Sequence, residues 1–331
     1  MAKKNVLIIS MDFIEPSTDM VADWIKHLGH NFTRFNGDTL ESLEINTLIS
    51  SKNNLDLTIE NKRVKKRYHS IWYRRWSNLK SHKAIVNLCS NYLDSVLSHA
   101  INNNISYNAY SVEQAIKKMF ITKKWLTNSS QTSVFKINVL MLAKKKGLLI
   151  PEFILTTRKT HLVEFYKEKN QKIIVKDLDS PFHYTSNKNN YLTYTELVTA
   201  KTLNTLPESF HLSFFQEYIE KEYEVRTFFL KDKLYSMAIF SQADKATTVD
   251  FRKSNYMKPN RTVPYRLPKQ TEKKLRILMK ELNLETGSID IIKSPNDNYY
   301  FLEVNPIGQF GMVSEPCNYN LELEIAHYLI S

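Results

Sequence analysis

Two short predicted strands near the carboxyl end constrain this chain most. The first covers residues 289–292 and the second residues 299–305, with turn-forming residues between them. Side chains alternate along a strand, so Glu303 and Asn305 project from one face, and Asp290 reaches that face in one register. Two carboxylates and an amide oxygen are hard donors that suit Mg²⁺, which keeps part of its shell for water and phosphate. The alternative is a solvated strand pair whose polar face meets water.

The residues around these strands resemble the metal-binding end of the ATP-grasp ligases. The likeness is carried by FLEVNPIG at 301–308 and by GSID at 287–290. The resemblance implies ATP and Mg²⁺ as cofactors, with Asp290, Glu303 and Asn305 as the metal ligands. It also implies that ATP activates a carboxylate as an acyl phosphate, from which a nucleophile displaces the phosphate.

Length and composition exclude several other classes of protein. A chain of 331 residues predicts two or three domains. No segment approaches the roughly 20 apolar residues that cross a bilayer. Only 6 glycines are present, without a Walker A or G-x-G-x-x-G pattern, which argues against P-loop and Rossmann folds. Cys89 and Cys317 lie far apart and fit reduced thiols in a cytoplasmic protein.

The net charge of +12 predicts an anionic partner, whether nucleic acid, membrane surface or acidic ligand. The densest basic run, residues 62–67, falls between predicted strands at 55–60 and 67–73, where we expect the end of a hairpin. No helix-turn-helix, zinc finger or aromatic-basic RNA motif accompanies it. The run is either a docking site for a peptide or a solvated turn.

The amino-terminal pattern predicts a β-α-β unit and hence a small parallel sheet. Strands are expected at 5–10 and 32–36, around a helix capped by Ser17 or Thr18 and ended by Gly29. Farther along, Arg74 and Arg75 lie between aromatic residues at a strand end. They either bind a carboxylate or phosphate or pack on the aromatic rings with solvated head groups.

The middle of the chain predicts a helix at 135–147 and strands at 149–157 and 172–177. Lys176 ends a run of β-branched residues, and a lysine in that position is more often simply a surface residue. This succession resembles the central ATP-grasp subdomain, which implies that Lys136 and Lys176 contact the nucleotide phosphates. Phe135 departs from the polar residue that the family often has there.

Residues 213–222 resemble the ATP-grasp hinge, whose backbone reads the adenine edge. The resemblance implies nucleotide contacts from Gln216, Glu217, Tyr218 and Ile219, and contacts to the ribose hydroxyls from Glu224.

Arg226 lies two residues after Glu224, on the same face of its predicted strand. The resemblance implies that Arg226 holds the developing acyl phosphate, since a fixed guanidinium stabilises a spreading negative charge. The alternative is a surface ion pair. Arg252 is expected as a second anion ligand, and no general base is evident.

The whole chain resembles the graspetide (ω-ester-containing peptide) maturases, nearest the grasp-with-spasm branch. The likeness rests on IWYRRW at 71–76, SQADKATTVDFR at 241–252 and FLEVNPIGQFGMVS at 301–314. It implies a ribosomal precursor peptide, leader plus core, as partner. A Glu or Asp side chain is phosphorylated, and a Ser or Thr hydroxyl or a Lys amine attacks it to close a ring. The positive net charge agrees in sign with an acidic peptide.

The expected fold is α/β (α+β), an ATP-grasp fold behind a small parallel-sheet domain of the pre-ATP-grasp type. We expect domain 1–128, a central subdomain 129–210 and a carboxyl-terminal metal subdomain 211–331. Neither a membrane nor a nucleic-acid partner is expected, and a homodimer stays open. Two alternatives remain: an ATP-grasp ligase that adds a free amino acid, and a non-enzymatic nucleotide- or nucleic-acid-binding protein.

Overall fold

The computed structural model describes most of the chain. The described residues are 2–11, 15–37, 47–50, 56–59, 62–63, 68–75, 95–120, 123–127, 134–178, 183–185, 190–243, 247–250, 253 and 259–331. The chain divides into two compact units: unit one holds 1–132, 309–314 and 320–331, and unit two holds 133–308 and 315–319. The expected boundaries after residues 128 and 210 stay a prediction.

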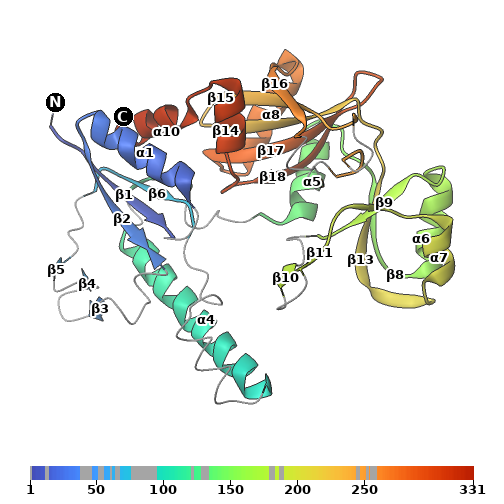
Figure 1. The fold of residues 1–331 in the computed structure, drawn as a ribbon, viewed down its shortest axis with the longest axis horizontal. Coiled ribbons are helices and arrows are strands. Elements are labelled where there is room, and N and C mark those ends of the chain that lie inside the picture. Colours follow the sequence, from blue (N-terminus) through green and yellow to red (C-terminus); the bar gives the residue numbers. More distant parts are fainter. Residues whose placement is uncertain are drawn as a thin grey trace. The chain divides into compact units, whose positions relative to one another are not determined.

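Unit one is built on a parallel sheet with the strand order β2-β1-β6-β7, of which β2, β1 and β6 are labelled in Figure 1. Its strands are β1 Asn5–Ser10, β2 Asn31–Asn36, β6 Ser70–Tyr73 and β7 Lys124–Leu126. Its helices are α1 Pro16–His27, α4 Ser95–Met119 and α10 Leu321–Ile330. Helix α10 contacts α1, β6 and β1, so the last helix of the chain completes the amino-terminal sheet.

The predicted β-α-β start is confirmed, since β1 and β2 are parallel and α1 lies between them in the chain. The predicted cap was wrong. Glu15 is the N-cap residue, and Ser17 and Thr18 lie inside the helix. Pro16 explains the earlier start, because a proline fits the first helical position, where no backbone N–H is needed.

The predicted hairpin around the basic run is also different in the structure. Strand β5, Lys62–Arg63, pairs antiparallel with β4, Asp56–Ile59, which in turn pairs with β3, Thr47–Ser50. Strand β6 belongs to the parallel sheet instead. The remainder of the run, residues 64–67, lies outside the described residues.

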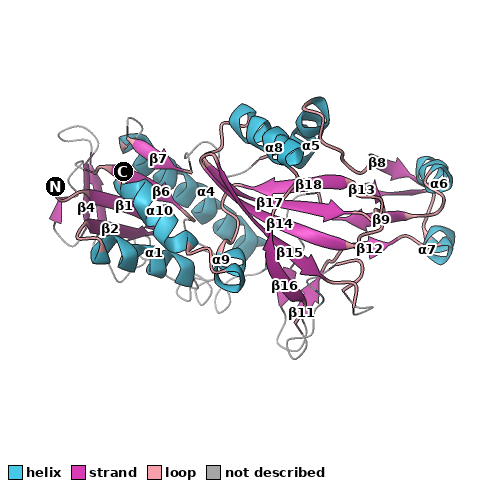
Figure 2. Cartoon of the chain, turned by 90° about the horizontal axis from the view of Figure 1, so that it is seen from above, coloured by secondary structure: helices cyan, strands magenta, loops and turns pink. Residues whose placement is uncertain are grey.

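Unit two contains two larger sheets (Figure 2). The first has the order β12-β9-β13-β8 and pairs antiparallel throughout. Its strands are β8 Phe153–Arg158, β9 Ile173–Lys176, β12 Glu196–Leu197 and β13 Ser209–Glu217. Helices α6, Lys159–Glu168, and α7, Ala200–Thr205, supply its core with Leu162, Phe165 and Leu203. A separate hairpin joins β10, His183–Thr185, to β11, Asn190–Leu192.

The second sheet is antiparallel, with the order β16-β15-β14-β17-β18. Its strands are β14 Tyr223–Leu230, β15 Lys233–Phe240, β16 Arg261–Tyr265, β17 Thr286–Lys293 and β18 Tyr299–Asn305. Helices α5, Lys136–Lys145, and α8, Lys269–Glu281, pack on its apolar face through residues that include Leu140 and Leu275. A short helix, α9, covers Gly311–Cys317. Arg226 and Asp290, which lie opposite each other on β14 and β17, are on the other face of this sheet.

Most strands of unit two lie close to the predicted positions. The strand expected at 149–157 begins only at Phe153, because Pro151 cannot donate a backbone hydrogen bond to a neighbouring strand. None of the helices in the described part of the chain combines the length and apolar character that crossing a membrane requires.

Candidate active site

A β-bulge brings two carboxylates together on the polar face of the second sheet. Ile291 lies opposite Phe301, but the next pair is Asp290 with Glu303, so Leu302 is an extra residue in β18. Regular pairing would have placed Leu302 opposite Asp290. Because of the extra residue, Phe301 and Val304 both enter the apolar core while Glu303 faces Asp290.

Asp290 and Glu303 are part of a charged row that crosses three strands. Arg226 on β14 lies opposite Asp290, with 3.6 Å between Arg226 Nη1 and Asp290 Oδ1. The three side chains are 15%, 26% and 39% exposed in the order Arg226, Asp290, Glu303, so the row is open to a ligand but largely desolvated. Interactions between such charges are stronger than between fully solvated ones.

Two lysines from other elements add positive charge beside Glu303. Lys136, the first residue of α5, lies with its Nζ 3.1 Å from Glu303 Oε2 and donates to the backbone oxygen of Asp177 at 3.3 Å. Lys176, at the end of β9, lies with its Nζ 5.7 Å from the centre of the Phe214 ring. Lys136 and Lys176, on different elements, both act electrostatically on the Glu303 carboxylate.

The pKa of Glu303 reflects this surrounding charge. Burial alone would raise it, but Lys136, Lys176 and Arg226 together lower the pKa below its ordinary value. Glu303 is thus kept ionised at neutral pH, as a metal-binding carboxylate must be.

Asn305 lies two residues beyond Glu303, opposite Ser288, at the end of β18. Its Oδ1 accepts a hydrogen bond from the backbone N–H of Ile307 at 3.1 Å, which orients the amide. The turn then packs tightly against β17: a Cβ on Gly308 would lie 2.5 Å from the Cβ of Ser288. Glycine at this position lets the turn that carries Asn305 rest directly on the neighbouring strand.

The predicted hinge is the end of β13 and the residues after it. Backbone hydrogen bonds fix it, from Glu217 N to the oxygen of Glu152 at 2.8 Å and from Tyr218 N to the oxygen of Lys172 at 2.9 Å. Gln216 and Ile219 are buried at this end of the strand. The segment is therefore held rigidly enough to present backbone groups to a planar ligand.

Glu224, the predicted ribose ligand, shares the sheet face of Arg226 and is 13% exposed. Its Oε1 forms an ion pair with Lys221 and accepts a hydrogen bond from Ser241 Oγ at 3.5 Å. Burial raises the pKa of Glu224, with Asp290 and Asp250 adding to the effect and Lys221 opposing it.

The residues present fit a nucleotide with magnesium. The buried donors that lack hydrogen-bond partners in the described part of the chain include Arg226 Nε and Gln216 Nε2, which both belong to the predicted site residues. Such groups are costly unless a ligand satisfies them. No cluster of three or more Asp, Glu, His or Cys side chains occurs among the described residues. The predicted set, two carboxylates and an amide, matches the few protein ligands that Mg²⁺ takes when phosphate oxygens complete its shell.

The structure thus brings together Lys136, Lys176, Arg226, Asp290 and Glu303. Asn305 lies on the same strand as Glu303, and Glu224 on the same strand as Arg226. Arg252 lies outside the described residues. The roles assigned to all of these residues stay predictions.

Elsewhere, in unit one, Arg74 and Arg75 face the carboxylate of Glu15, with Arg75 Nε 2.6 Å from its Oε1. The expected ligand carboxylate is therefore supplied by the chain itself. The Arg74 guanidinium also lies over the rings of Trp72 and Phe310, as the packing alternative predicted. The prediction that its head group is solvated was wrong, because Arg74 is 3% exposed.

Sequence reasoning missed Lys221 and Ser241, the two partners of Glu224. Lys221 lies in an acidic run just before β14, where a lysine is normally solvated, so only its spacing of three residues from Glu224 was a signal.

Comparison with known proteins adds independent information. The model of the family described as "RimK-like ATP-grasp domain" matches residues 134–329. The macrocyclase MdnC of Microcystis aeruginosa MRC, solved with the precursor peptide MdnA, is 25% identical, with a TM-score of 0.79 over 98% of this chain and 99% of that one.

Two further solved structures share the fold. A RiPP-associated ATP-grasp ligase of Chryseobacterium gregarium, with ADP and a leader and core peptide, is 24% identical, with a TM-score of 0.82 over 99% of this chain and 96% of that one. The ATP-grasp ligase PsnB, with a precursor variant, Mg and ADP, is 15% identical, with a TM-score of 0.73 over 100% and 98% of the chains. No curated protein matches the sequence.

Proposed function

The chain belongs to the RimK-like ATP-grasp family, and we propose that it is an ATP-dependent macrocyclase that matures a ribosomally made precursor peptide. In this reaction a Glu or Asp side chain of the peptide becomes an acyl phosphate. A Ser or Thr hydroxyl or a Lys amine of the same peptide then forms an ester or amide cross-link. This is the reaction that the resemblance to graspetide maturases implies.

The observation that carries the proposal is the charged row of Arg226, Asp290 and Glu303, with Lys136 beside it. Three cations surround a carboxylate whose pKa they lower, and Arg226 Nε on the same sheet is a buried donor without a hydrogen-bond partner. A phosphorylated ligand with its cation satisfies such a site, whereas an uncharged ligand would leave those charges desolvated.

Each residue then has a defined task. Asp290, Glu303 and Asn305 would hold Mg²⁺, which when bound screens the charge of the phosphates. Lys136 and Lys176 neutralise phosphate oxygens. Arg226 stabilises the negative charge that develops as the phosphoryl group moves to the peptide carboxylate, because its guanidinium is already fixed beside Asp290. Residues 216–219 hold the adenine and Glu224 holds the ribose.

Several observations support a peptide as the acceptor of the phosphoryl group. MdnC, which matches this chain along nearly its whole length, was solved with a precursor peptide. The net charge of +12 favours an acidic peptide. We place the reaction in the cytoplasm, where ATP and newly synthesised peptide are both available.

The atoms of the reaction give a direct test. One carboxylate oxygen of the peptide attacks the γ-phosphorus of ATP and ADP leaves. The hydroxyl or amine then attacks the carbonyl carbon, its proton passes to solvent, and phosphate departs with that carboxylate oxygen. A peptide labelled with ¹⁸O in its Glu and Asp side chains should therefore deliver one ¹⁸O to inorganic phosphate for each bond formed, measured by mass spectrometry of the phosphate.

The same experiment with Glu281→Gln controls for the loss of a glutamate charge outside the site. Glu281 pairs with Lys146 at 2.6 Å, away from the site, so this variant should transfer ¹⁸O as the wild type does. Cross-linked peptide with unlabelled phosphate would rule out the acyl phosphate route, and hydrolysis of ATP without any cross-link would rule out cyclisation.

A further inference from the structure

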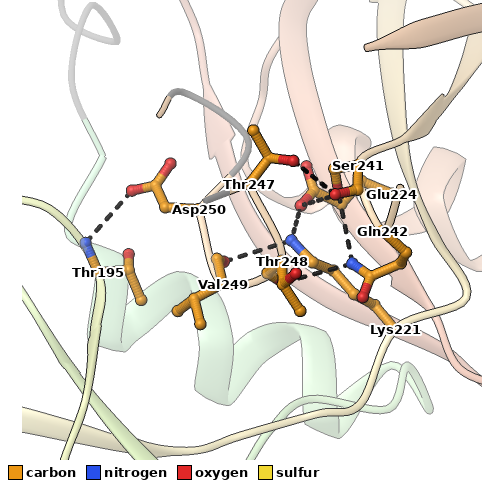
Figure 3. A network of polar contacts seen from close by, with 9 residues as sticks. All are labelled: Thr195, Lys221, Glu224, Ser241, Gln242, Thr247, Thr248, Val249 and Asp250. Carbon is orange, nitrogen blue, oxygen red and sulfur yellow. Dashed lines mark hydrogen bonds and ion pairs between the residues drawn. The ribbon is translucent and has the colours of Figure 1, made fainter. Parts of the chain in front are cut away.

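Lys221 is a buried lysine between the hinge and β14, and no role was predicted for it. Its side chain is 2% exposed, and its ammonium contacts Glu224 Oε1 and the backbone oxygen of Val249, the latter at 3.3 Å (Figure 3). A lysine is rarely buried this deeply unless its charge is compensated. Glu224 and the Val249 carbonyl provide that compensation.

Among the described residues, the contacts to the Glu224 carboxylate are made through Oε1. Within the described residues, both Lys221 and Ser241 meet Oε1, which leaves Oε2 for a ligand. A carboxylate fixed through one oxygen presents the other in a defined direction. Two vicinal hydroxyls, as on a ribose, are hydrogen-bond donors that suit such an acceptor.

A short segment of the chain holds Lys221 in place from the far side. Thr247 Oγ1 donates to the backbone oxygen of Ser241 at 2.6 Å, and Gln242 Nε2 donates to the backbone oxygen of Thr248 at 3.3 Å (Figure 3). These bonds fix the backbone just before Val249, whose oxygen accepts from Lys221.

The same segment also contacts the residue just before β12. Asp250 Oδ2 accepts a hydrogen bond from the backbone N–H of Thr195 at 3.2 Å (Figure 3). The position of the Lys221 ammonium is thus determined by contacts on several sides rather than by Glu224 alone.

We propose that Lys221 is a positioning residue that turns Glu224 toward the ribose hydroxyls of ATP and so determines selectivity for ribonucleotides over deoxyribonucleotides. The proposal rests on the proposed function, because it needs ATP in this site. Lys221 itself does not touch the nucleotide, since its ammonium is enclosed by Glu224 and the 247–250 segment.

A purely structural ion pair makes a different prediction. Such a pair contributes to stability, but its loss lowers the affinity for every ligand of the site equally. A positioning role affects only the part of the ligand that Glu224 touches. Selectivity between nucleotides that differ by one hydroxyl therefore separates the two roles, because stability and phosphate binding cancel in the ratio.

The test compares dissociation constants for ATP, 2′-deoxy-ATP and 3′-deoxy-ATP with Mg²⁺, measured by calorimetry. We expect wild type to prefer ATP by about tenfold or more over at least one analogue, the effect of losing a hydrogen bond to a charged group. In Lys221→Met this ratio should fall to about 1, while the affinity for inorganic triphosphate stays within about twofold of wild type. Lys221→Arg should restore part of the preference.

Two further variants sharpen the comparison. Lys293→Met removes another buried lysine, the last residue of β17, which pairs with Glu222 at 2.5 Å and Asp297 at 2.7 Å. This variant should keep the wild-type ratio. Lys221→Gln keeps a donor for the Val249 oxygen and replaces Lys221→Met in the test if that variant does not fold. The double variant Lys221→Gln with Glu224→Gln should have the same selectivity as Glu224→Gln alone.

Each outcome is decisive. An unchanged ratio in Lys221→Gln or Lys221→Met, in a protein that binds ATP, overturns the role of Lys221 and leaves the proposed function intact. A wild type that binds ATP without preferring the ribose also overturns it. A wild type that binds neither ATP nor triphosphate overturns the proposed function, and this inference falls with it.

Discussion

Asp290 and Glu303 face each other across β17 and β18 because Leu302 is an extra residue in the second strand. The bulge lets Phe301 and Val304, three residues apart, both pack in the core while Glu303 stays on the polar face. Bulges of this kind re-aim side chains beside active sites. Two of the predicted metal ligands thus lie at an irregularity in the strand pairing rather than at a regular position.

The first prediction concerns the charge of Glu303. Glu303→Gln keeps the shape of the side chain but removes the charge that Lys136 compensates at 3.1 Å. We expect ADP release to fall by about 100-fold or more, as for the loss of an electrostatic group at a reacting centre. A coupled assay for ADP measures this, with thermal unfolding as the check on folding. An active Glu303→Gln protein would exclude Glu303 as a metal ligand.

The second prediction concerns Gly308. A Cβ at this position would lie 2.5 Å from Ser288 Cβ and 2.6 Å from Ser288 Oγ. Gly308→Ala should therefore lower the free energy of unfolding by about 1–3 kcal/mol, the usual cost of overpacking, and weaken Mg²⁺-dependent ATP binding by displacing Asn305. Denaturant titration and calorimetry measure the two effects.

The control for Gly308 is Gly311→Ala, where an added Cβ meets nothing within 4 Å and stability should not change. Ser288→Gly in the Gly308→Ala background removes the clashing atoms and should restore part of the stability. Equal stability of the Gly308→Ala variant and the wild type would show that the turn is free to move.

The third prediction concerns pH. The pKa of Glu224 is raised above its ordinary value by burial, so acidification protonates it earlier than an exposed glutamate. The ionised form accepts the ribose hydroxyls, so ATP affinity should be complete above this pKa and decline as the pH falls through it. Glu224→Gln should lack this decline. Because the γ-phosphate of ATP titrates equally with both proteins, the difference between their profiles isolates Glu224; identical profiles would argue against the ribose role.

The fourth prediction concerns strand β5, which carries Lys62 and Arg63. If this basic strand docks the acidic peptide, Lys62→Glu with Arg63→Glu should raise the peptide KM several-fold, as for the loss of rim charges, and leave the ATP KM unchanged. Steady-state kinetics with the encoded precursor measures both. An unaltered peptide KM would assign the strand to solubility instead.

The sequence pattern predicts much of unit two for a physical reason. Long β-branched and aromatic runs, such as β9 and β14, leave little choice but strand, and Gly147, at a φ of +79°, ends the α5 region as expected. The pattern also allows Asp290 and Glu303 to share a face in one of the possible registers. It does not predict the bulge at Leu302. Strict alternation would place Phe301 and Glu303 on the same face, whereas in the structure Phe301 is in the core and Glu303 is on the other face.

Long-range pairing is what the sequence conceals. The pairing of β6 with β1, and not with β4, depends on contacts far apart in the chain. The burial of Arg74 has the same origin, since it requires the carboxylate of Glu15, which lies far away in the chain. Periodicity within one segment carries no information about such partners.

The central claim is tested most directly by mass spectrometry of the encoded precursor peptide after incubation with the protein, ATP and Mg²⁺. We predict that the peptide loses one water for each ADP released, and that Glu303→Gln leaves it unchanged. A peptide that gains the mass of an added amino acid would contradict the assignment. A peptide that binds to the protein but keeps its mass, with no ATP consumed, would contradict it as well.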